Sequence, residues 1–322
     1  MTASPYVLSF IGSDDPLRGD SQAVKGLGKA FADKTGRSWV MLDDKIVTDL
    51  YPGHTPDEAY DLFFADHGEP EIVLSNSRNL QGRAFPQSHV ISGNNEELSK
   101  LYNPDLPSLV SHHHTQSSLE EAGREFRKYF PCLTRPLIAL MHIETGLRHQ
   151  DLAEQIVAMI GAENHCAATV FICGTRRTPV QAQIDLLSSL RREIGKSGLE
   201  VDVKNYLLGP QFNRSEDFNP YAGLIATADH FILAGESKSI ISECLFSGKS
   251  VMTFGTSYRD LESYGFAHYL KHHDTRKGFP TRTLPPLNVT ELMAEAMIEK
   301  YELETGRAAR ASRPQLDDLR PL

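Results

Sequence analysis

The sequence predicts an α/β fold built from two Rossmann-like domains, each with a parallel sheet. Short apolar runs alternate with longer amphipathic runs along most of the 322 residues, which is typical of β–α–β units. This alternation starts again after residues 134–136, and a chain of this length has enough material for two cores. We therefore expect a first domain over 1–133, a second over 134–305, and a polar, mobile tail over 306–322.

Strands are predicted where short segments are rich in apolar and β-branched residues. The first, PYVLSFIG at 5–12, ends at a glycine that suits a turn. By the same criterion we expect strands at 71–76, 88–93, 107–114, 136–143, 167–174, 199–207, 231–234 and 250–254. Because the sheets should be parallel, ligands should bind beyond the carboxyl ends of these strands.

Helices are predicted where apolar residues recur with the period of an α-helix. Within 21–36, Ala23 and Leu27 lie four residues apart on one face, and Gly36 suits the C-terminal cap. Pro179 fits the first position of the long helix that follows it. The same spacing predicts helices at 118–130, 151–161, 180–195, 219–229 and 239–246.

Composition excludes several classes of protein. The chain has 33 Lys and Arg against 42 Asp and Glu, a net charge of −9, so a nucleic-acid partner bound through a basic surface is not expected. No apolar stretch approaches the ~18 residues of a transmembrane helix. Residues 1–5 lack the charged and apolar regions of a signal peptide. We expect a cytoplasmic protein, at most peripheral to the inner face of a membrane.

The cysteines predict packing rather than metal binding or catalysis. None of them forms a C-x-x-C pair, and three sit in or beside apolar runs, as expected for buried free thiols in a reducing compartment. The four cysteines are Cys132, Cys166, Cys173 and Cys244.

The turn after the strand at 231–234 has the composition of an anion site. Gly235 lets the chain turn, and the N–H groups at the start of the next helix would face a phosphate that the helix dipole favours. Ser237 and Ser239 would add hydroxyl donors. Glu243, one helical turn further, could accept hydrogen bonds from a ribose diol. The same pattern also fits a simple N-cap at Ser239 with a solvated Glu243.

A second turn carries two arginines. The motif TRRTP places Thr175, Arg176, Arg177 and Thr178 directly after a predicted strand. Guanidinium groups match phosphate oxygens, and this turn lies at the ligand-binding edge of the sheet. We therefore favour a pyrophosphate clamp over a pair of solvated surface arginines. The short turn that ends in Gly146 would shape the floor of the same cleft.

The first loop of the chain is polar and carries the carboxylates of Asp14, Asp15 and Asp20. A carboxylate there could act as general base toward an acceptor hydroxyl, and we favour Asp20 because it lies at the start of the first helix. The loop does not match G-x-G-x-x-G, so no dinucleotide cofactor is expected. The alternative is a flexible surface loop in which Asp20 is the helix N-cap.

Three adjacent histidines, His112, His113 and His114, follow a predicted strand. On a strand they would point to alternate faces, so at most two of them could share one metal, and no other metal motif accompanies them. We favour a histidine that lines the cleft, with His113 the second candidate for the general base. No metal and no cofactor is expected.

Four segments, taken in order, resemble the mitochondrial-fission ELM family of glycosyltransferase-like proteins in the GT-B superfamily. They are GDSQA with GL in 19–27, the segment 102–114, the TRRTP turn, and the stretch 219–250 with its G-x-S-x-S-x-x-S-E motif. The resemblance implies two facing Rossmann-like domains, the C-terminal one for a nucleotide-sugar and the N-terminal one for the acceptor. It also implies that Glu243 binds the donor ribose, that the turn before it binds the diphosphate, and that no metal is needed.

These observations together predict a metal-independent glycosyltransferase. It would move a sugar from a nucleotide-sugar donor to a hydroxyl of a glycan or lipid-linked acceptor, and Arg176, Arg177 and the helix at Ser239 would stabilise the leaving diphosphate. Two alternatives remain, a non-catalytic scaffold that keeps the fold and a sugar-nucleotide epimerase.

Overall fold

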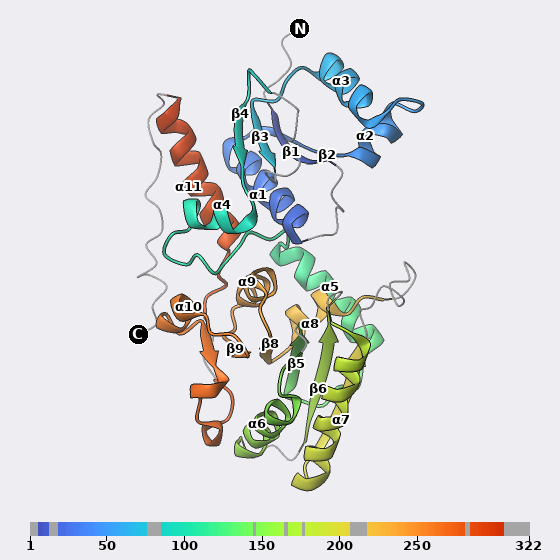
Figure 1. The fold of residues 1–322 in the computed structure, drawn as a ribbon, viewed down its shortest axis with the longest axis vertical. Helices are drawn as coiled ribbons and strands as arrows, with labels where there is room; N and C mark the ends of the chain where they lie inside the picture. The colour runs from blue at the N-terminus through green and yellow to red at the C-terminus, as the bar shows by residue number, and fades with distance from the viewer. Residues whose placement is uncertain are drawn as a thin grey trace. The chain divides into compact units, whose positions relative to one another are not determined.

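The computed structural model describes residues 6–12, 19–75, 85–143, 146–163, 167–175, 178–206, 218–280 and 284–305 (Figure 1). The described chain divides into two compact units. The N-terminal unit holds the residues up to His113 and those from Asn288 onward, and the C-terminal unit holds the residues from His114 to Leu287.

The N-terminal unit contains a parallel sheet with the strand order β2-β1-β3-β4. Its elements are β1 (Tyr6–Gly12), α1 (Gly19–Thr35), β2 (Ser38–Asp43), α2 (Asp44–Leu50), α3 (Pro56–His67), β3 (Ile72–Ser75), β4 (His89–Ser92), α4 (Asn95–Tyr102) and α11 (Val289–Glu304). Every residue of β1 is buried, because its apolar side chains face helices on both sides of the sheet. Leu8, Phe10 and Val73 lie in the core of this unit.

The last helix, α11, belongs to the N-terminal unit although it lies near the end of the chain; Figure 1 shows it in red beside α4. Lys34 of α1 forms an ion pair of 2.6 Å with Glu291 of α11. Tyr301 donates a hydrogen bond of 2.5 Å to Glu71, which also binds Arg37 at 2.7 Å. Because of these contacts, α11 belongs to the N-terminal unit, whereas the sequence placed its residues in the predicted second domain, 134–305.

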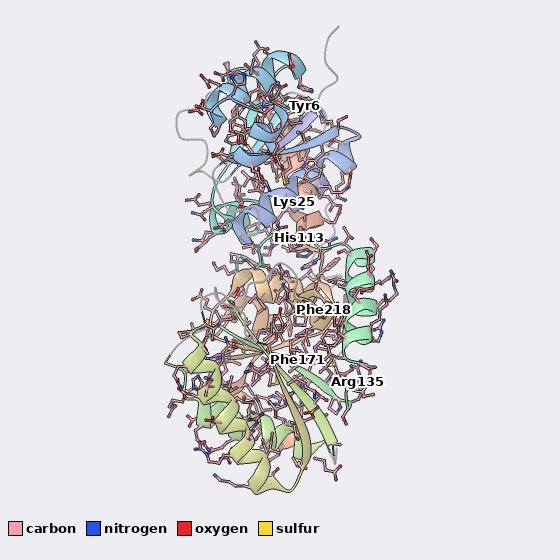
Figure 2. The ribbon with its side chains drawn as sticks, turned by 90° about the vertical axis from the view of Figure 1, so that its right-hand side faces the viewer. Tyr6, Lys25, His113, Arg135, Phe171 and Phe218 are labelled. Atoms are coloured by element: carbon pink, nitrogen blue, oxygen red, sulfur yellow. The ribbon has the colours of Figure 1, made fainter. Side chains whose placement is uncertain are left out.

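The C-terminal unit contains a six-stranded parallel sheet with the strand order β10-β9-β8-β5-β6-β7. Its elements are α5 (Gln116–Tyr129), β5 (Leu137–His142), α6 (His149–Ala162), β6 (Ala167–Gly174), α7 (Val180–Ser197), β7 (Glu200–Tyr206), α8 (Tyr221–Thr227), β8 (His230–Ala234), α9 (Lys238–Phe246), β9 (Val251–Phe254), α10 (Arg259–Ser263) and β10 (Ala267–Tyr269), with 3₁₀ helices at Leu270–His272 and Thr275–Lys277. Phe171 of β6, labelled in Figure 2, is almost fully buried in this unit. The predicted fold class, α/β with two parallel sheets, is confirmed.

Helix α5 lies in the C-terminal unit, although the predicted boundary at residues 133/134 placed it in the first domain. It packs closely on α8, where Gly123 of α5 and Gly223 of α8 leave room for the neighbouring helix. A Cβ atom on Gly223 would lie 2.4 Å from Phe126 Cβ and 3.0 Å from the carbonyl oxygen of Ala122.

Gly223→Ala is expected to destabilise the protein by about 1–3 kcal/mol, because the added methyl group overpacks the contact between α5 and α8. Gly195→Ala is the matched control. Gly195 is an exposed glycine of α7 with no atom within 4 Å of an added Cβ, so this variant should gain up to about 1 kcal/mol from helix propensity. Urea unfolding measures both free energies. Equal stabilities for Gly223→Ala and the parent protein would contradict the close packing.

The predicted strand at 107–114 is wrong. Leu109, Val110 and His112 are buried, but the segment pairs with no strand in the part of the chain that the structure describes. Its backbone is bound by side chains instead: the His112 N–H donates to Thr290 Oγ1 at 2.8 Å, and the Thr290 hydroxyl donates back to the His112 carbonyl at 2.8 Å. Ser99 Oγ donates to the Leu109 carbonyl. Apolar composition indicated burial correctly, but it could not indicate which groups satisfy the backbone.

Two of the cysteines are buried as predicted. Cys173 and Cys244 are buried free thiols, whereas Cys132 is exposed and Cys166 lies outside the described residues. Burial raises the pKa of Cys173 to about 12, and burial with the neighbouring Glu243 raises that of Cys244 well above its usual range. Both thiols are therefore protonated at neutral pH and act as small apolar side chains. Among the described helices, none has the length and apolar character needed to cross a membrane.

Candidate functional site

The candidate site lies at the carboxyl ends of β5, β6 and β8 in the C-terminal unit. The sheet order reverses between β5 and β8, because β6 and β7 follow β5 on one side while β9 and β10 follow β8 on the other. Ligands of open parallel sheets bind at such a switch point. Gly146 lies in the loop after β5 and is exposed, with a φ of 83°. Gly235 lies directly after β8 and has a φ of 108°, so its turn requires a glycine.

The turn after β8 differs from the predicted anion site in detail. Helix α9 begins at Lys238, and its N-cap is Ser237 rather than Ser239, because Ser237 Oγ accepts a hydrogen bond of 3.3 Å from the Ile240 N–H. The Ile241 N–H donates to the Ser237 carbonyl at 3.1 Å. The N–H groups of Ser239, Ile240 and Ile241 were expected to face a ligand, but those of Ile240 and Ile241 bond to Ser237 instead. Ser239 is half-buried in the first turn.

Tyr258 fixes this turn from the next loop. Its hydroxyl oxygen accepts a hydrogen bond of 2.9 Å from the Ser237 N–H, and the residue is 4% exposed. The Gly235 N–H donates to the Phe254 carbonyl at 2.9 Å. The chain between β8 and α9 is thus held at both ends, and a ligand would meet a preformed turn.

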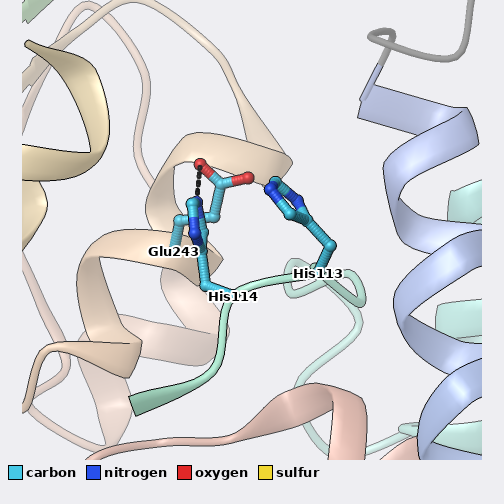
Figure 3. A group of neighbouring side chains, drawn as sticks. All are labelled: His113, His114 and Glu243. Atoms are coloured by element: carbon cyan, nitrogen blue, oxygen red, sulfur yellow. Dashed lines mark ion pairs between the residues drawn. The ribbon is translucent and has the colours of Figure 1, made fainter. Parts of the chain in front are cut away.

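Glu243 lies in α9 and is buried, with 8% of its surface exposed. The Tyr221 hydroxyl donates a hydrogen bond to Glu243 Oε2, and His114 Nε2 lies 3.8 Å from the same oxygen. Figure 3 draws the Glu243 carboxylate with the His114 side chain of the same unit. The alternative of a solvated Glu243 is wrong, because this carboxyl group lies among fixed partners.

The charge of Glu243 changes near neutral pH. Burial raises the pKa of its carboxyl group to about 7, and the hydrogen bond from Tyr221 acts in the opposite direction because it favours the ionised form. Burial and the nearby Glu243 carboxylate raise the pKa of the Tyr221 hydroxyl well above its usual range. Tyr221 therefore remains a hydrogen-bond donor over the pH range in which Glu243 ionises.

The TRRTP turn after β6 is anchored by Thr178. This residue is 3% exposed. Its hydroxyl donates a hydrogen bond of 2.5 Å to the His142 carbonyl and accepts one of 3.0 Å from the Thr175 N–H. Thr178 thus ties the turn to the end of β5, while Thr175 is half-buried beside it. The two arginines between them, Arg176 and Arg177, lie outside the described residues.

Three polar residues near this edge were not predicted from the sequence. His142, the last residue of β5, is fully buried, and its Nε2 lies 3.3 Å from Nε2 of His149, the first residue of α6. Burial lowers the pKa of His149. Gln183 is fully buried over Gly174, where an added Cβ would lie 2.2 Å from its Nε2. The signal in the sequence for His142 is a polar residue at the final position of an apolar strand.

The N-terminal unit contains the two candidates for a general base. Asp20 is half-buried in the first turn of α1. Because α1 begins at Gly19, Asp20 is not its N-cap. His113 is exposed, and His112 is buried. Asp14 and Asp15 lie outside the described residues.

Two parallel sheets flanked by helices, one with the strand order of a dinucleotide-binding fold, define a Rossmann-like α/β protein. The profile of the mitochondrial fission ELM1 family matches residues 107–301, more than half of the chain, so the protein belongs to this family. The relationship inferred from the sequence motifs is thereby confirmed. No curated protein matches the chain.

Several solved structures show a distant likeness. A glycosyl transferase family 9 protein from Veillonella parvula is 11% identical, with a TM-score of 0.43 over 79% of this chain and 82% of that one. A UDP-GlcNAc 2-epimerase from Neisseria meningitidis, bound to UDP-GlcNAc, is 10% identical, with a TM-score of 0.43 over 96% and 95%. A glycosyltransferase from Rickettsia africae is 12% identical, with a TM-score of 0.38 over 94% and 89%.

Proposed function

We propose that the protein is a metal-independent glycosyltransferase whose C-terminal unit binds a nucleotide-sugar donor. The observation that carries the proposal is the buried carboxyl group of Glu243 one turn into α9, the helix that follows the switch-point strand β8. A buried acid with a raised pKa at the ligand-binding edge of a Rossmann-like sheet is a candidate functional group. Its carboxylate would accept hydrogen bonds from the hydroxyl groups of the donor ribose.

The remaining roles follow from the chemistry of glycosyl transfer. The acceptor hydroxyl, from a glycan or a lipid-linked sugar, attacks the anomeric carbon; the bond from that carbon to the diphosphate oxygen breaks, and the hydroxyl proton passes to a base. We propose Asp20 as this base, with His113 as the second candidate. Arg176, Arg177 and the first turn of α9 at Ser239 would stabilise the charge that develops on the leaving diphosphate.

Binding of nucleotide-sugars tests the proposal directly. We expect one of UDP-, GDP-, ADP- or CMP-sugars to give saturable heat in isothermal titration with the full chain. A non-catalytic scaffold would bind none of them. An epimerase would bind its donor and convert the sugar without an acceptor, which NMR of the sugar-nucleotide would show. Acceptor-dependent release of the nucleotide, a nucleoside diphosphate from a UDP-, GDP- or ADP-sugar and CMP from a CMP-sugar, is the result expected for a transferase.

Arg176→Ala is expected to weaken binding of the nucleoside diphosphate by about 1.5–3 kcal/mol, the worth of a hydrogen bond to a charged group. The parent nucleoside, which lacks phosphates, should lose much less. Arg191→Ala, an exposed arginine of α7, is the matched control and should change neither affinity by more than about 0.5 kcal/mol. Titration calorimetry measures all three proteins. Equal losses for nucleotide and nucleoside would show that Arg176 does not contact phosphate.

A further inference from the structure

Tyr221 contacts Glu243 from a separate element. It is the first residue of α8 and lies 22 positions before Glu243 in the chain. Its backbone N–H donates a hydrogen bond of 3.0 Å to Asn219 Oδ1. Helix α8 is held against α5 by the close contact at Gly223. The Tyr221 hydroxyl therefore reaches Glu243 from a fixed backbone position.

The two carboxylate oxygens of Glu243 have different surroundings. Oε2 accepts the hydrogen bond from Tyr221 and lies 3.8 Å from His114 Nε2. Neither contact involves Oε1. A carboxylate held through one oxygen cannot rotate freely, so its second oxygen has a defined direction.

We infer that Tyr221 is the positioning residue of this site: its hydroxyl holds Glu243 through Oε2 and leaves Oε1 to accept the hydroxyl groups of the nucleotide ribose. The inference deepens the proposed function and rests on it for the identity of the ligand. Tyr221 acts through Glu243 and makes no contact with the reacting atoms.

The charge balance around Glu243 supports this role. Burial favours the neutral carboxyl group, and the hydrogen bond from Tyr221 favours the ionised one. Within the described part of the C-terminal unit, the titratable groups that face the pair include His114, Cys244 on α9 and Cys173 at the end of β6. Both thiols are neutral at pH 7, as described above. The Tyr221 hydroxyl is neutral at pH 7, so its removal takes away one hydrogen bond and no charge.

Tyr221→Phe separates positioning from packing, because phenylalanine keeps the ring and removes only the hydroxyl group. A hydrogen bond to a charged group corresponds to a change of about tenfold or more in the protonation equilibrium. The pKa of Glu243, about 7 in the parent protein, should therefore rise by about one unit. At pH 7 the ionised fraction would fall about fivefold, and the affinity for nucleoside diphosphate would fall with it and recover above pH 8.

The test has two measurements on the full chain. The first is a carbon-13 NMR titration of labelled glutamate side chains without nucleotide, in which Glu243→Gln identifies the Glu243 signal. The second is a calorimetric measurement of the affinity for a nucleoside diphosphate at several pH values between 6 and 9. Tyr129→Phe is the matched control, since Tyr129 is 60% exposed in the same unit and its ring stacks on Phe218. Both measurements on this control should equal those on the parent protein.

The two measurements separate the inference from the proposed function. An upward shift of the Glu243 titration in Tyr221→Phe, with binding that recovers at high pH, supports the inference. An unchanged Glu243 titration in a folded Tyr221→Phe overturns it, even if nucleotide binds. A shifted titration in a protein that binds no nucleotide at any pH leaves Tyr221 as the partner of Glu243, but it refutes the ribose as ligand and with it the proposed function.

Discussion

Asp20→Asn is expected to lower turnover by about 10²–10⁴-fold and to leave the affinity for the nucleotide-sugar donor nearly unchanged. Asparagine has almost the shape of aspartate but cannot accept the proton that the acceptor hydroxyl loses. The donor would be held by the C-terminal unit, whereas Asp20 lies in the N-terminal unit, so the binding step should not depend on it. Release of nucleoside diphosphate measures turnover, and titration calorimetry measures donor affinity.

Asp33→Asn is the matched control for this experiment. Asp33 lies on the same helix, α1, and forms an exposed ion pair of 2.7 Å with Lys29. Its loss should change turnover by less than a factor of about two, because exposed pairs contribute little. If Asp20→Asn keeps the parent rate, the base lies elsewhere, and His113→Ala becomes the next variant to measure.

Glu243→Gln is expected to weaken binding of ribonucleotides by about 1.5–3 kcal/mol at a pH above 7.5, because glutamine keeps the shape but loses the charge and one acceptor. The expected pH dependence follows from the raised pKa. Below about pH 7 the carboxyl group is protonated and accepts hydrogen bonds poorly, and above it the ionised group accepts them well. Affinity of the parent protein should therefore rise as the pH passes through 7, and Glu243→Gln should lack this rise.

Two controls make the result specific to the ribose. The diphosphate titrates in the same pH range, but it does so equally in both proteins and cancels in the comparison. A 2′-deoxy nucleotide already lacks part of the interaction, so Glu243→Gln should cost it less, and the four affinities form a double-mutant-style cycle. Glu236→Gln, an exposed acid in the turn before α9, should leave all affinities within about 0.5 kcal/mol. A coupling energy near zero between Glu243 and the 2′-hydroxyl would refute the ribose contact.

The sequence predicted the C-terminal sheet well because its strands are buried on both faces. Runs such as 167–174 and 231–234 are almost uninterrupted in apolar residues, and the structure has β6 at Ala167–Gly174 and β8 at His230–Ala234. The segment 107–114 has a similar composition, but it is buried by contacts with distant side chains such as Thr290. Helix α11 was missed, and no local pattern indicates that it packs against α1 instead of against the strands nearest to it in the chain.

The sequence predicted where the candidate residues lie in the fold, but not which groups surround them. Gly235 directly follows β8 and Glu243 lies on α9, as expected, because a turn residue and an isolated acid stand out beside an apolar strand. Their partners could not be found, because the hydrogen bond from Tyr221 and the neighbouring His114 depend on how α8 and the start of the unit pack around α9. Ser237 and Thr178, which were expected to bind the donor, also bond the protein's own backbone: Ser237 as the N-cap of its own helix, and Thr178 to the distant carbonyl of His142.

The most direct test of the central claim, that the C-terminal unit binds a nucleoside diphosphate with Glu243 on the ribose, is a crystal structure of the full chain grown with UDP, GDP or ADP. We predict the diphosphate at the first turn of α9, the ribose hydroxyls within hydrogen-bond distance of Glu243 Oε1, and Tyr221 still bound to Oε2. A nucleotide bound in the N-terminal unit, or one whose ribose does not touch Glu243, would contradict the claim.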